Sequence, residues 1–414
     1  MSLTERDFAP LAEVAVRLGV NLQPGQRLWV NSPVAHAALV RAVARAAYEA
    51  GARDVKADFH DELLGKIRLE MAPEAGLAEF PQWIADGLET EAKGGTAFLS
   101  VLGSDPELLS SVPPARVAMS MKAAQQAMVN YRPYLLSHRA AWSIIAAPAP
   151  AWAKKVFPDT SEDQAMDLLW QAIQRASRVD GPDPIAAWHA HIANLQARVA
   201  WLNGLSIRQL HYQGPGTDLT VGLPPTHQWV ASGQRRSVGY ATSPNIPTEE
   251  VFTLPLRTGV QGTVQSTMPL SHSGQLIDGI ALTFKDGRIV SYSASTGQDA
   301  LGQVIETDDG SRYLGEVALV PVDSPIAQSG ILYYNTLFDE NASCHLAIGA
   351  AYPNTLTDGA EVASDQDLLE KGGNVSMTHV DFMVGSQDLS IDAETAAGKT
   401  VAIFRKGRWA TQPA

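Results

Sequence analysis

The first third of the chain alternates between strand-like and helix-like runs, and this order constrains the possible fold more than any other feature. The strand-like runs are short and mostly apolar, at residues 27–31, 54–59, 96–101 and 141–146. Residues 35–50 are rich in alanine, with apolar residues at helical spacing and Gly51 as a stop signal, and residues 115–131 also have helical character. Such alternation favours an open, mostly parallel sheet with helices packed on it.

A change in the sequence pattern marks a second domain. Residues 161–203 have a helical composition that is interrupted at Asp180-Gly-Pro-Asp-Pro184, the best candidate for a boundary. The chain of 414 residues is also too long for one ordinary core. We therefore predict an N-terminal α/β domain with a mostly parallel sheet over residues 1–185. A β-rich α+β catalytic domain is predicted over residues 186–414.

The prediction of β structure in the second half rests on short alternating runs separated by turn residues. Residues 280–284 and 288–292 are two such runs, and Asp286-Gly287 lies between them. An Asp-Gly pair in this position is a strong hairpin signal, because both residues tolerate positive φ. The second domain is therefore expected to be largely antiparallel, with a few helices.

Charge and cysteine usage exclude several classes of partner. The formal net charge is −13 and there is no run of Lys and Arg, so we expect no nucleic-acid partner. The single cysteine, Cys344, excludes a disulfide framework within one chain and suits the cytoplasm. The start of the chain lacks the basic and apolar regions of a signal peptide. The most apolar run, residues 140–152, is broken by two prolines and is too short to span a membrane, so no membrane partner is expected.

The strongest chemical signal is the pair His379 and Asp381. On a strand, alternate side chains share a face, so this imidazole and this carboxylate are expected to point the same way. The pair forms half of a metal site, although a buried histidine beside a solvated aspartate is the commoner structural outcome. Glu250, Glu316 and His345 lie upstream and could complete the site. If the five residues converge, the protein is a hydrolytic metalloenzyme.

The acidic candidates each have a plain structural alternative. Glu249 and Glu250 lie where a loop enters a strand, face opposite sides of it, and could both be solvated. The apolar residues that follow suggest instead that one of them enters a site. Glu316 is a lone carboxylate in an otherwise apolar strand, residues 313–321, where an unpaired buried charge would cost on the order of several kcal/mol. It is therefore expected to be paired, metal-bound or pointed at water.

His345 is interpreted as the start of a helix. Asn341 and Ser343 suit a helix N-terminus, and a helix through residues 346–350 would return Tyr352 to the face of His345. The structural alternative is a helix with a polar start and a tyrosine packed in the core. Cys344 is interpreted as a small buried neighbour rather than a nucleophile.

Sequence motifs of other classes of enzyme are absent from the chain. The turn after the first strand has no glycine, which excludes the dinucleotide-binding fingerprint there. Gly398-Lys399-Thr400 lacks the leading glycine of a phosphate-binding loop, and no Gly-x-Ser-x-Gly elbow occurs. The remaining histidines show no partner pattern and receive no role.

Five segments, in order, carry a family resemblance: NIPTEEVFT, YLGE, FDENASCH, AYP and THVDFM. Together with the start of the chain and its alanine-rich first helix, they resemble the thermophilic metalloaminopeptidases, the family of aminopeptidase T and aminopeptidase S. The resemblance extends across the chain, and it implies release of N-terminal amino acids from peptides by a homodimer. The metal ligands that it implies are Glu250, Glu316, His345, His379 and Asp381.

The same resemblance implies two divalent ions and an active-site tyrosine at Tyr352. Our hypothesis is that Glu316 bridges the ions, that Glu250 and His345 bind one of them, and that His379 and Asp381 bind the other. Tyr352 would stabilise the oxyanion or orient the substrate, and Glu249 is a weaker candidate for a base. These ligands do not select between zinc, cobalt, manganese and magnesium.

Two other functions remain open from the sequence. One is a peptide- or metal-binding protein without turnover, and the other is a metal-dependent hydrolase of a different amide or ester. The complete set of ligands argues against the first of these. Comparing an amino-acid anilide with its N-blocked equivalent would test the second.

Overall fold

The computed structural model describes residues 3–234 and 238–411 and divides the chain into two compact units. The first unit is Met1–His191 with Ser232–Thr248, and the second is Ile192–Ala231 with Glu249–Ala414. The division falls within helix α10, Pro184–Gly204. The domain limits at residues 185 and 186 stay a prediction. Among the described helices, none has both the length and the apolar character needed to cross a membrane.

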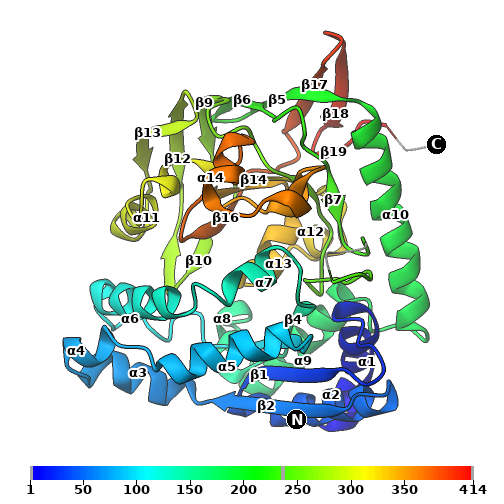
Figure 1. Cartoon of the computed structure of the whole chain (residues 1–414), viewed down its shortest axis with the longest axis vertical. Helices are drawn as coiled ribbons and strands as arrows, with labels where there is room; N and C mark the ends of the chain where they lie inside the picture. The colour runs from blue at the N-terminus through cyan, green and yellow to red at the C-terminus, as the bar shows by residue number, and fades with distance from the viewer. Residues whose placement is uncertain (1–2, 235–237, 412–414) are drawn as a thin grey trace. The chain divides into compact units, whose positions relative to one another are not determined.

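The first unit is built on a four-stranded parallel sheet in the order β2-β1-β3-β4 (Figure 1). The strands are β1 (Arg27–Pro33), β2 (Asp54–His60), β3 (Ala97–Leu102) and β4 (Trp142–Ala146). The α-helices are α1 (Glu5–Val14), α2 (Ala37–Glu49), α3 (Glu62–Met71), α4 (Glu74–Leu77), α5 (Gln82–Lys93), α6 (Pro114–Ala127), α7 (Arg132–Leu136), α8 (Pro150–Val156) and α9 (Glu162–Ala176). All four predicted strands are present, which confirms the α/β class of the N-terminal part.

Strand burial follows the position of each strand in this sheet. In the central strand β3, residues of both faces are buried, as expected for a parallel strand with neighbours on either side. The edge strand β2 is exposed along most of its length and carries Asp54, Lys56 and Asp58. Charged side chains on an edge strand hinder pairing with another chain. Helix α2 packs through Leu39, Val43 and other small apolar residues and ends just before Gly51, whose φ is +93°.

The second unit contains antiparallel sheets, which confirms the predicted β-rich class (Figure 1). An eight-stranded sheet has the order β13-β12-β9-β6-β5-β17-β18-β19, and a five-stranded sheet has the order β16-β15-β14-β8-β7. The first consists of β5 (Ile207–Gly214), β6 (Thr217–Gly222), β9 (Val260–Gln265), β12 (Ala281–Lys285), β13 (Arg288–Ser293), β17 (Ser390–Thr395), β18 (Thr400–Arg405) and β19 (Arg408–Trp409). The second consists of β7 (Val230–Ala231), β8 (Val251–Thr253), β14 (Leu314–Leu319), β15 (His345–Gly349) and β16 (His379–Met383).

Shorter elements complete the unit. A two-stranded ribbon pairs β10 (Leu270–His272) with β11 (Gln275–Ile277). The helices are α11 (Gln298–Ile305), α12 (Pro325–Ser329), α13 (Thr336–Asp339) and α14 (Asp365–Glu370). The predicted hairpin joins β12 to β13, and Asp286 and Gly287 have φ values of 49° and 80°. Both central residues therefore have the positive φ that a two-residue hairpin of this kind requires.

One apolar cluster is shared by the two large sheets and decides which face of the five-stranded sheet is left for polar groups. Val317 of β14, Leu346 of β15 and Phe382 of β16 pack in this cluster, together with Leu210 and Phe404 of the eight-stranded sheet. Side chains alternate across a strand, so the residues next to these three in sequence face away from the cluster. This opposite face carries the polar residues of the candidate site.

Candidate metal centre

The structure brings together all five residues that the sequence analysis proposed as metal ligands. Glu316 lies on β14, His345 on β15, and His379 and Asp381 on β16, while Glu250 immediately precedes β8. Each of the residues on β14, β15 and β16 is next in sequence to a member of the shared apolar cluster. Packing of the apolar residues therefore sets the direction of the polar ones.

Strand register explains how the carboxylates approach one another. Ala347 of β15 is paired with Glu316 on one side and with Asp381 on the other. The small side chain at the middle position leaves the space above the sheet open to the longer side chains of its neighbours. In the same register, His379 is paired with Gly349, which has no side chain.

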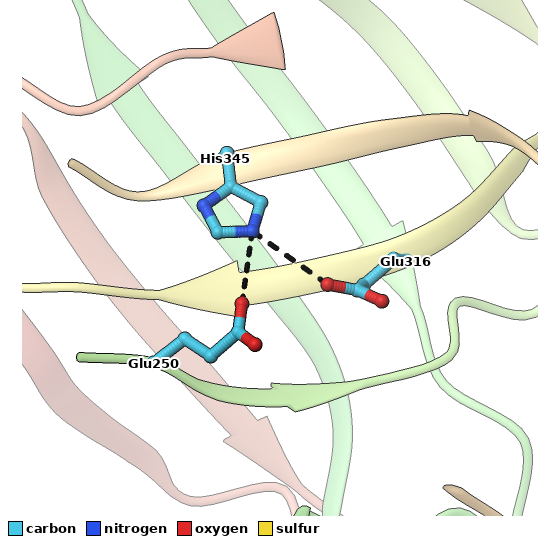
Figure 2. A group of neighbouring side chains, drawn as sticks. All are labelled: Glu250, Glu316 and His345. Carbon is cyan, nitrogen blue, oxygen red and sulfur yellow. Dashed lines mark ion pairs between the residues drawn. The ribbon is translucent and has the colours of Figure 1, made fainter. Parts of the chain in front are cut away.

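Glu316 lies between the two imidazoles. Its Oε1 is 3.6 Å from Nε2 of His345, and its Oε2 is 3.7 Å from Nε2 of His379. Nε2 of His345 is also 3.2 Å from Oε2 of Glu250, and Nε2 of His379 is 3.4 Å from Oδ1 of Asp381. Figure 2 shows Glu250, Glu316 and His345 converging from three neighbouring segments of the sheet. The five residues thus form two groups, each with ligand atoms within 4.8 Å of one another, and Glu316 belongs to both.

Backbone carbonyl groups orient both imidazoles. Nδ1 of His345 lies 2.8 Å from the carbonyl oxygen of Glu340, and Nδ1 of His379 lies 2.7 Å from that of Ala350. A carbonyl oxygen only accepts, so Nδ1 of each ring donates. In the neutral ring, Nε2 then keeps its lone pair and points at the carboxylates. This is the arrangement that metal-ligating histidines adopt in proteins.

The buried charges perturb one another strongly. Burial raises the pKa of Glu316 to about 7. The Glu250 carboxylate also raises this pKa, whereas the hydrogen bond from His345 lowers it. Burial alone would lower the pKa of His379, but the Asp381 and Glu316 carboxylates outweigh it and raise that pKa to about 10. The pKa of His345 is also raised well above its usual value, because Glu250 and Glu316 outweigh burial. A metal ion would have to displace these imidazolium protons, so its binding should weaken as the pH falls.

The set of donors fits divalent cations. Among the described residues, no lysine or arginine forms an ion pair with Glu250, Glu316 or Asp381, whose recorded ionic partners are the two histidines. Oδ1 of Asp381 is buried and has no hydrogen-bond partner among the described residues. Buried carboxylates require paired charge or a metal. Carboxylate oxygens and imidazole nitrogens are also the ligands that divalent ions such as zinc take in proteins.

The helix predicted to begin at His345 is wrong. Residues His345–Gly349 form β15, a strand paired on both sides and buried throughout. Every position is covered, so the apolar pattern does not distinguish a strand from a helix. Asn341 does not cap a helix here, because its Oδ1 accepts a hydrogen bond of 2.7 Å from the backbone N–H of Glu249.

Tyr352 reaches the site by a different route from the predicted one. The chain leaves β15 at Gly349, whose φ is +107°, and Tyr352 follows in a loop. Its ring lies 4.9 Å from the His379 ring and 6.3 Å from the Phe252 ring, both in edge-to-face geometry. Burial, followed by the Glu316 and Asp381 carboxylates, raises the pKa of Tyr352 well above its usual value of 10. The phenol therefore keeps its proton and can donate it in a hydrogen bond.

Glu340 is a buried acid at the site that the sequence analysis overlooked. Its pKa is raised well above the usual value by burial and then by the Asp381 and Glu250 carboxylates. Its own carbonyl oxygen is the group that orients His345. The only signal in the sequence is an acid between Asp339 and Asn341, which is ordinary on a surface turn. Glu249, considered as a base, belongs to neither group of ligand atoms.

Comparison with known proteins finds relatives along nearly the whole chain. Residues 4–409 match the family described as thermophilic metalloprotease (M29). Aminopeptidase 2 of Geobacillus stearothermophilus is 48% identical, over 99% of this chain and 99% of its own length. Aminopeptidase AmpS of Bacillus subtilis is 48% identical over 96% of this chain and 97% of its own. The solved structure of wild-type AmpT from Thermus thermophilus is 39% identical, with a TM-score of 0.90 and coverage of 98% of this chain and 100% of AmpT.

Proposed function

The chain belongs to the thermophilic metalloprotease family and is a metal-dependent aminopeptidase, and we propose that it uses two divalent ions held on the five-stranded sheet. The observation that carries the proposal is the position of Glu316. Each of its carboxylate oxygens faces a different imidazole, and a further carboxylate lies beside each imidazole. A single ion would leave one of these groups without a cation.

Each ion would be held by one group and would share the central carboxylate. Glu250 and His345 would bind one ion, His379 and Asp381 the other, and Glu316 both. The charge of His345 acts on the pKa of Glu340, and Glu340 is proposed as a further acidic group of the first site. Zinc, cobalt, manganese and magnesium all suit a set of two imidazoles and several carboxylates. Analysis of the metal content of the purified protein would identify the metal.

The roles of the protein groups follow from their positions. When bound, the ions polarise the scissile carbonyl and lower the pKa of water. The Ala350 and Glu340 carbonyl groups keep the imidazoles in the orientation in which Nε2 faces the ion. The Tyr352 phenol, which stays protonated, is placed beside His379 to donate a hydrogen bond to the substrate oxygen that becomes negative.

Metal removal and restoration, read on paired substrates, test the proposed function. We expect chelator to abolish release of the amino acid from leucine anilide, and we expect one of the four metals to restore it. The N-acetylated anilide should remain uncleaved throughout, because an aminopeptidase needs the free amino group. Cleavage of the N-acetylated substrate would indicate a hydrolase of another amide. Binding of metal and dipeptide without turnover would indicate a binding protein.

We also propose that the protein is a homodimer, and helix α3 is the surface that supports this. Its apolar residues are exposed: Leu63 by 64%, Leu64 by 66%, Ile67 by 50% and Met71 by 78%. Their spacing puts them on one side of the helix. The residue between them, Arg68, instead donates a hydrogen bond of 2.9 Å to Ser120 of α6. An apolar helix face left outward in this way is typical of a protein interface.

The change Leu64→Asp tests this surface. An unpaired charge in an apolar interface is costly, so we expect the wild-type protein to sediment as a dimer and the variant as a monomer. Val290 is 56% exposed on β13, and Val290→Asp is the matched control that should remain dimeric. A monomeric wild-type protein would disprove the dimer. A dimeric Leu64→Asp variant would disprove the role of α3.

A further inference from the structure

One buried carboxamide connects the segments next to the three strands that carry the site. Asn374 is fully buried and lies five residues before His379. Its Nδ2 donates to the carbonyl oxygen of Gly310, at 2.8 Å, and to that of Gly349, at 2.7 Å. Gly310 lies in the turn that leads into β14, and Gly349 is the last residue of β15. Asn374 itself lies in the segment that leads into β16.

The hydrogen bond to Gly349 lies next to the group that orients His379. The carbonyl oxygen of the following residue, Ala350, accepts the hydrogen bond from Nδ1 of His379. The backbone N–H of Ala350 is held at 2.7 Å from the carbonyl oxygen of Thr378. The Gly349-Ala350 peptide unit is thus fixed on one side by Asn374 and on the other by the segment entering β16. This unit directly precedes the Ala350 carbonyl group that sets the imidazole direction.

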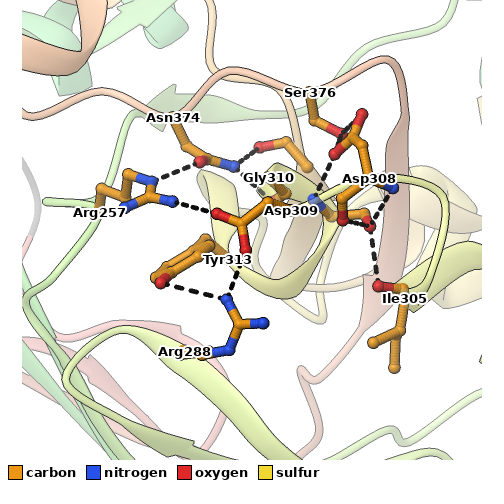
Figure 3. Close-up of polar contacts among 11 residues, drawn as sticks. Arg257, Arg288, Ile305, Asp308, Asp309, Gly310, Tyr313, Asn374 and Ser376 are labelled. Carbon is orange, nitrogen blue, oxygen red and sulfur yellow. Dashed lines mark hydrogen bonds and ion pairs between the residues drawn. The ribbon is translucent and has the colours of Figure 1, made fainter.

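A separate set of contacts fixes the orientation of the carboxamide itself (Figure 3). Nε of Arg257 donates to Oδ1 of Asn374 at 3.0 Å, which leaves Nδ2 directed at the two carbonyl groups. Arg257 in turn lies 3.6 Å from the centre of the Tyr313 ring and forms an ion pair of 3.1 Å with Asp309. Asp309 also pairs with Arg288, at 2.8 Å.

Gly310 and Gly349, whose carbonyl groups accept from Asn374, pack closely against the backbone of the segment that follows Asn374. A Cβ atom added at Gly310 would lie 1.8 Å from the carbonyl oxygen of Val375, and one at Gly349 would lie 2.2 Å from that of Thr378. The three segments therefore meet with backbone against backbone. A buried carbonyl group without a donor costs about 1–3 kcal/mol, and Asn374 supplies a donor to that of Gly349. The carbonyl group of Gly310 also accepts from the backbone N–H of Tyr313, at 3.0 Å.

We propose that Asn374 is a positioning residue for the metal site formed by Glu316, His379 and Asp381, acting through the Gly349-Ala350 peptide. It does not belong to either group of ligand atoms. Loss of the hydrogen bond to Gly349 would loosen the Gly349-Ala350 peptide, and with it the position of the following Ala350 carbonyl group. The His379 ring could then rotate away from the ion. The proposal rests on the proposed two-metal function and adds a residue outside the ligand set to it.

Titration of Co²⁺ into the metal-free protein, followed by visible absorption, tests this role in Asn374→Ala. Partners that orient a ligand typically contribute about 10- to 100-fold to metal affinity. We therefore expect the dissociation constant of one Co²⁺-binding step to rise by about that factor. The dissociation constant of the other step should change by less than about twofold. Raising the Co²⁺ concentration should restore kcat, with little change in KM. The circular dichroism of the metal-free variant checks that it is folded.

Two further variants keep the test decisive. If Asn374→Ala does not fold, Asn374→Asp retains the size of the side chain and an acceptor for Arg257 but loses the amide donors, and the same weakening of one step is expected. As the control, Asp392→Asn removes an ion pair of 2.5 Å with Arg405 on the eight-stranded sheet and leaves the contacts of Asn374 in place, so both steps should stay unchanged.

Several results would overturn the role of Asn374. These are unchanged binding in the folded variant, equal weakening of both steps, or the same loss in Asp392→Asn. In each of these cases the wild-type protein still binds two ions and the proposed function stands. If the wild-type protein binds no Co²⁺, the two-metal function fails together with the role of Asn374.

Discussion

Replacing Glu316 by Gln is expected to lower kcat/KM by about a thousandfold or more. Among the described residues, Glu316 alone belongs to both groups of ligand atoms, so its loss should weaken the binding of both ions at once. Charge stabilisation by a metal ion is worth several kcal/mol, and about 4 kcal/mol corresponds to about a thousandfold in rate. Steady-state kinetics on leucine anilide, at a fixed excess of metal, measure the effect.

The same change should leave the metal-free protein at least as stable as the wild type above about pH 5. Burial raises the pKa of Glu316 from 4.5 to about 7, so ionisation of this group opposes folding as the pH rises through this range. Gln has nearly the same shape and no charge to bury. Thermal melting of both metal-free proteins at pH 5 and pH 8 should therefore favour the variant more at pH 8.

A surface glutamate provides the control for Glu316. Glu306 is paired with Arg312 at 3.4 Å and its side chain is 58% exposed. Exposed pairs contribute only about 0–1 kcal/mol, so Glu306→Gln should change neither turnover nor metal content. Wild-type turnover with two bound ions in Glu316→Gln would contradict the shared position of this carboxylate.

Replacing Tyr352 by Phe is expected to lower kcat by about 100- to 1000-fold, with KM and metal content nearly unchanged. Removal of one donor to a developing oxyanion has an effect of this size. The Phe ring would keep the edge-to-face contacts with His379 and Phe252, so the imidazole should stay in place. Kinetics combined with metal analysis of the purified variant separate loss of the donor from loss of the metal.

The pH profile adds a second check on Tyr352. Its pKa is raised well above 10, so no loss of wild-type activity below pH 10 should arise from this phenol. Tyr292→Phe is the matched control, since it removes only a surface hydrogen bond of 3.0 Å to Glu306. An unchanged kcat in Tyr352→Phe, or a variant that has lost its metal, would contradict the role of oxyanion donor.

Local pattern was sufficient where one strand carries two site residues. His379 and Asp381 alternate with Val380 and Phe382, so the polar pair and the apolar pair were assigned to opposite faces from sequence, and the structure confirms this. The Asp-Gly hairpin and the four parallel strands were also predicted, because turn chemistry and alternation are local properties. Alternation before β8 put Glu249 and Glu250 on opposite sides, and the family resemblance selected Glu250 as the ligand.

Local pattern failed where burial is complete or where the partners are distant in sequence. β15 is covered on both faces, so its apolar residues carry no period that excludes a helix. Asn374 owes its position to backbone carbonyl groups on other segments, and the carbonyl group of Glu340 accepts a hydrogen bond from the His345 ring. No spacing in the sequence reveals these contacts. The dimer, the cytoplasmic location and the number of ions stay predictions.

Anomalous X-ray diffraction from crystals of the metal-loaded protein tests the central claim most directly. Data collected at the absorption edge of the bound metal should show two peaks on the face of the five-stranded sheet opposite the shared apolar cluster. One peak should lie beside each carboxylate oxygen of Glu316, with Glu250 and His345 at the first and His379 and Asp381 at the second. A single peak, or two peaks that do not share Glu316, would contradict the proposed two-metal site.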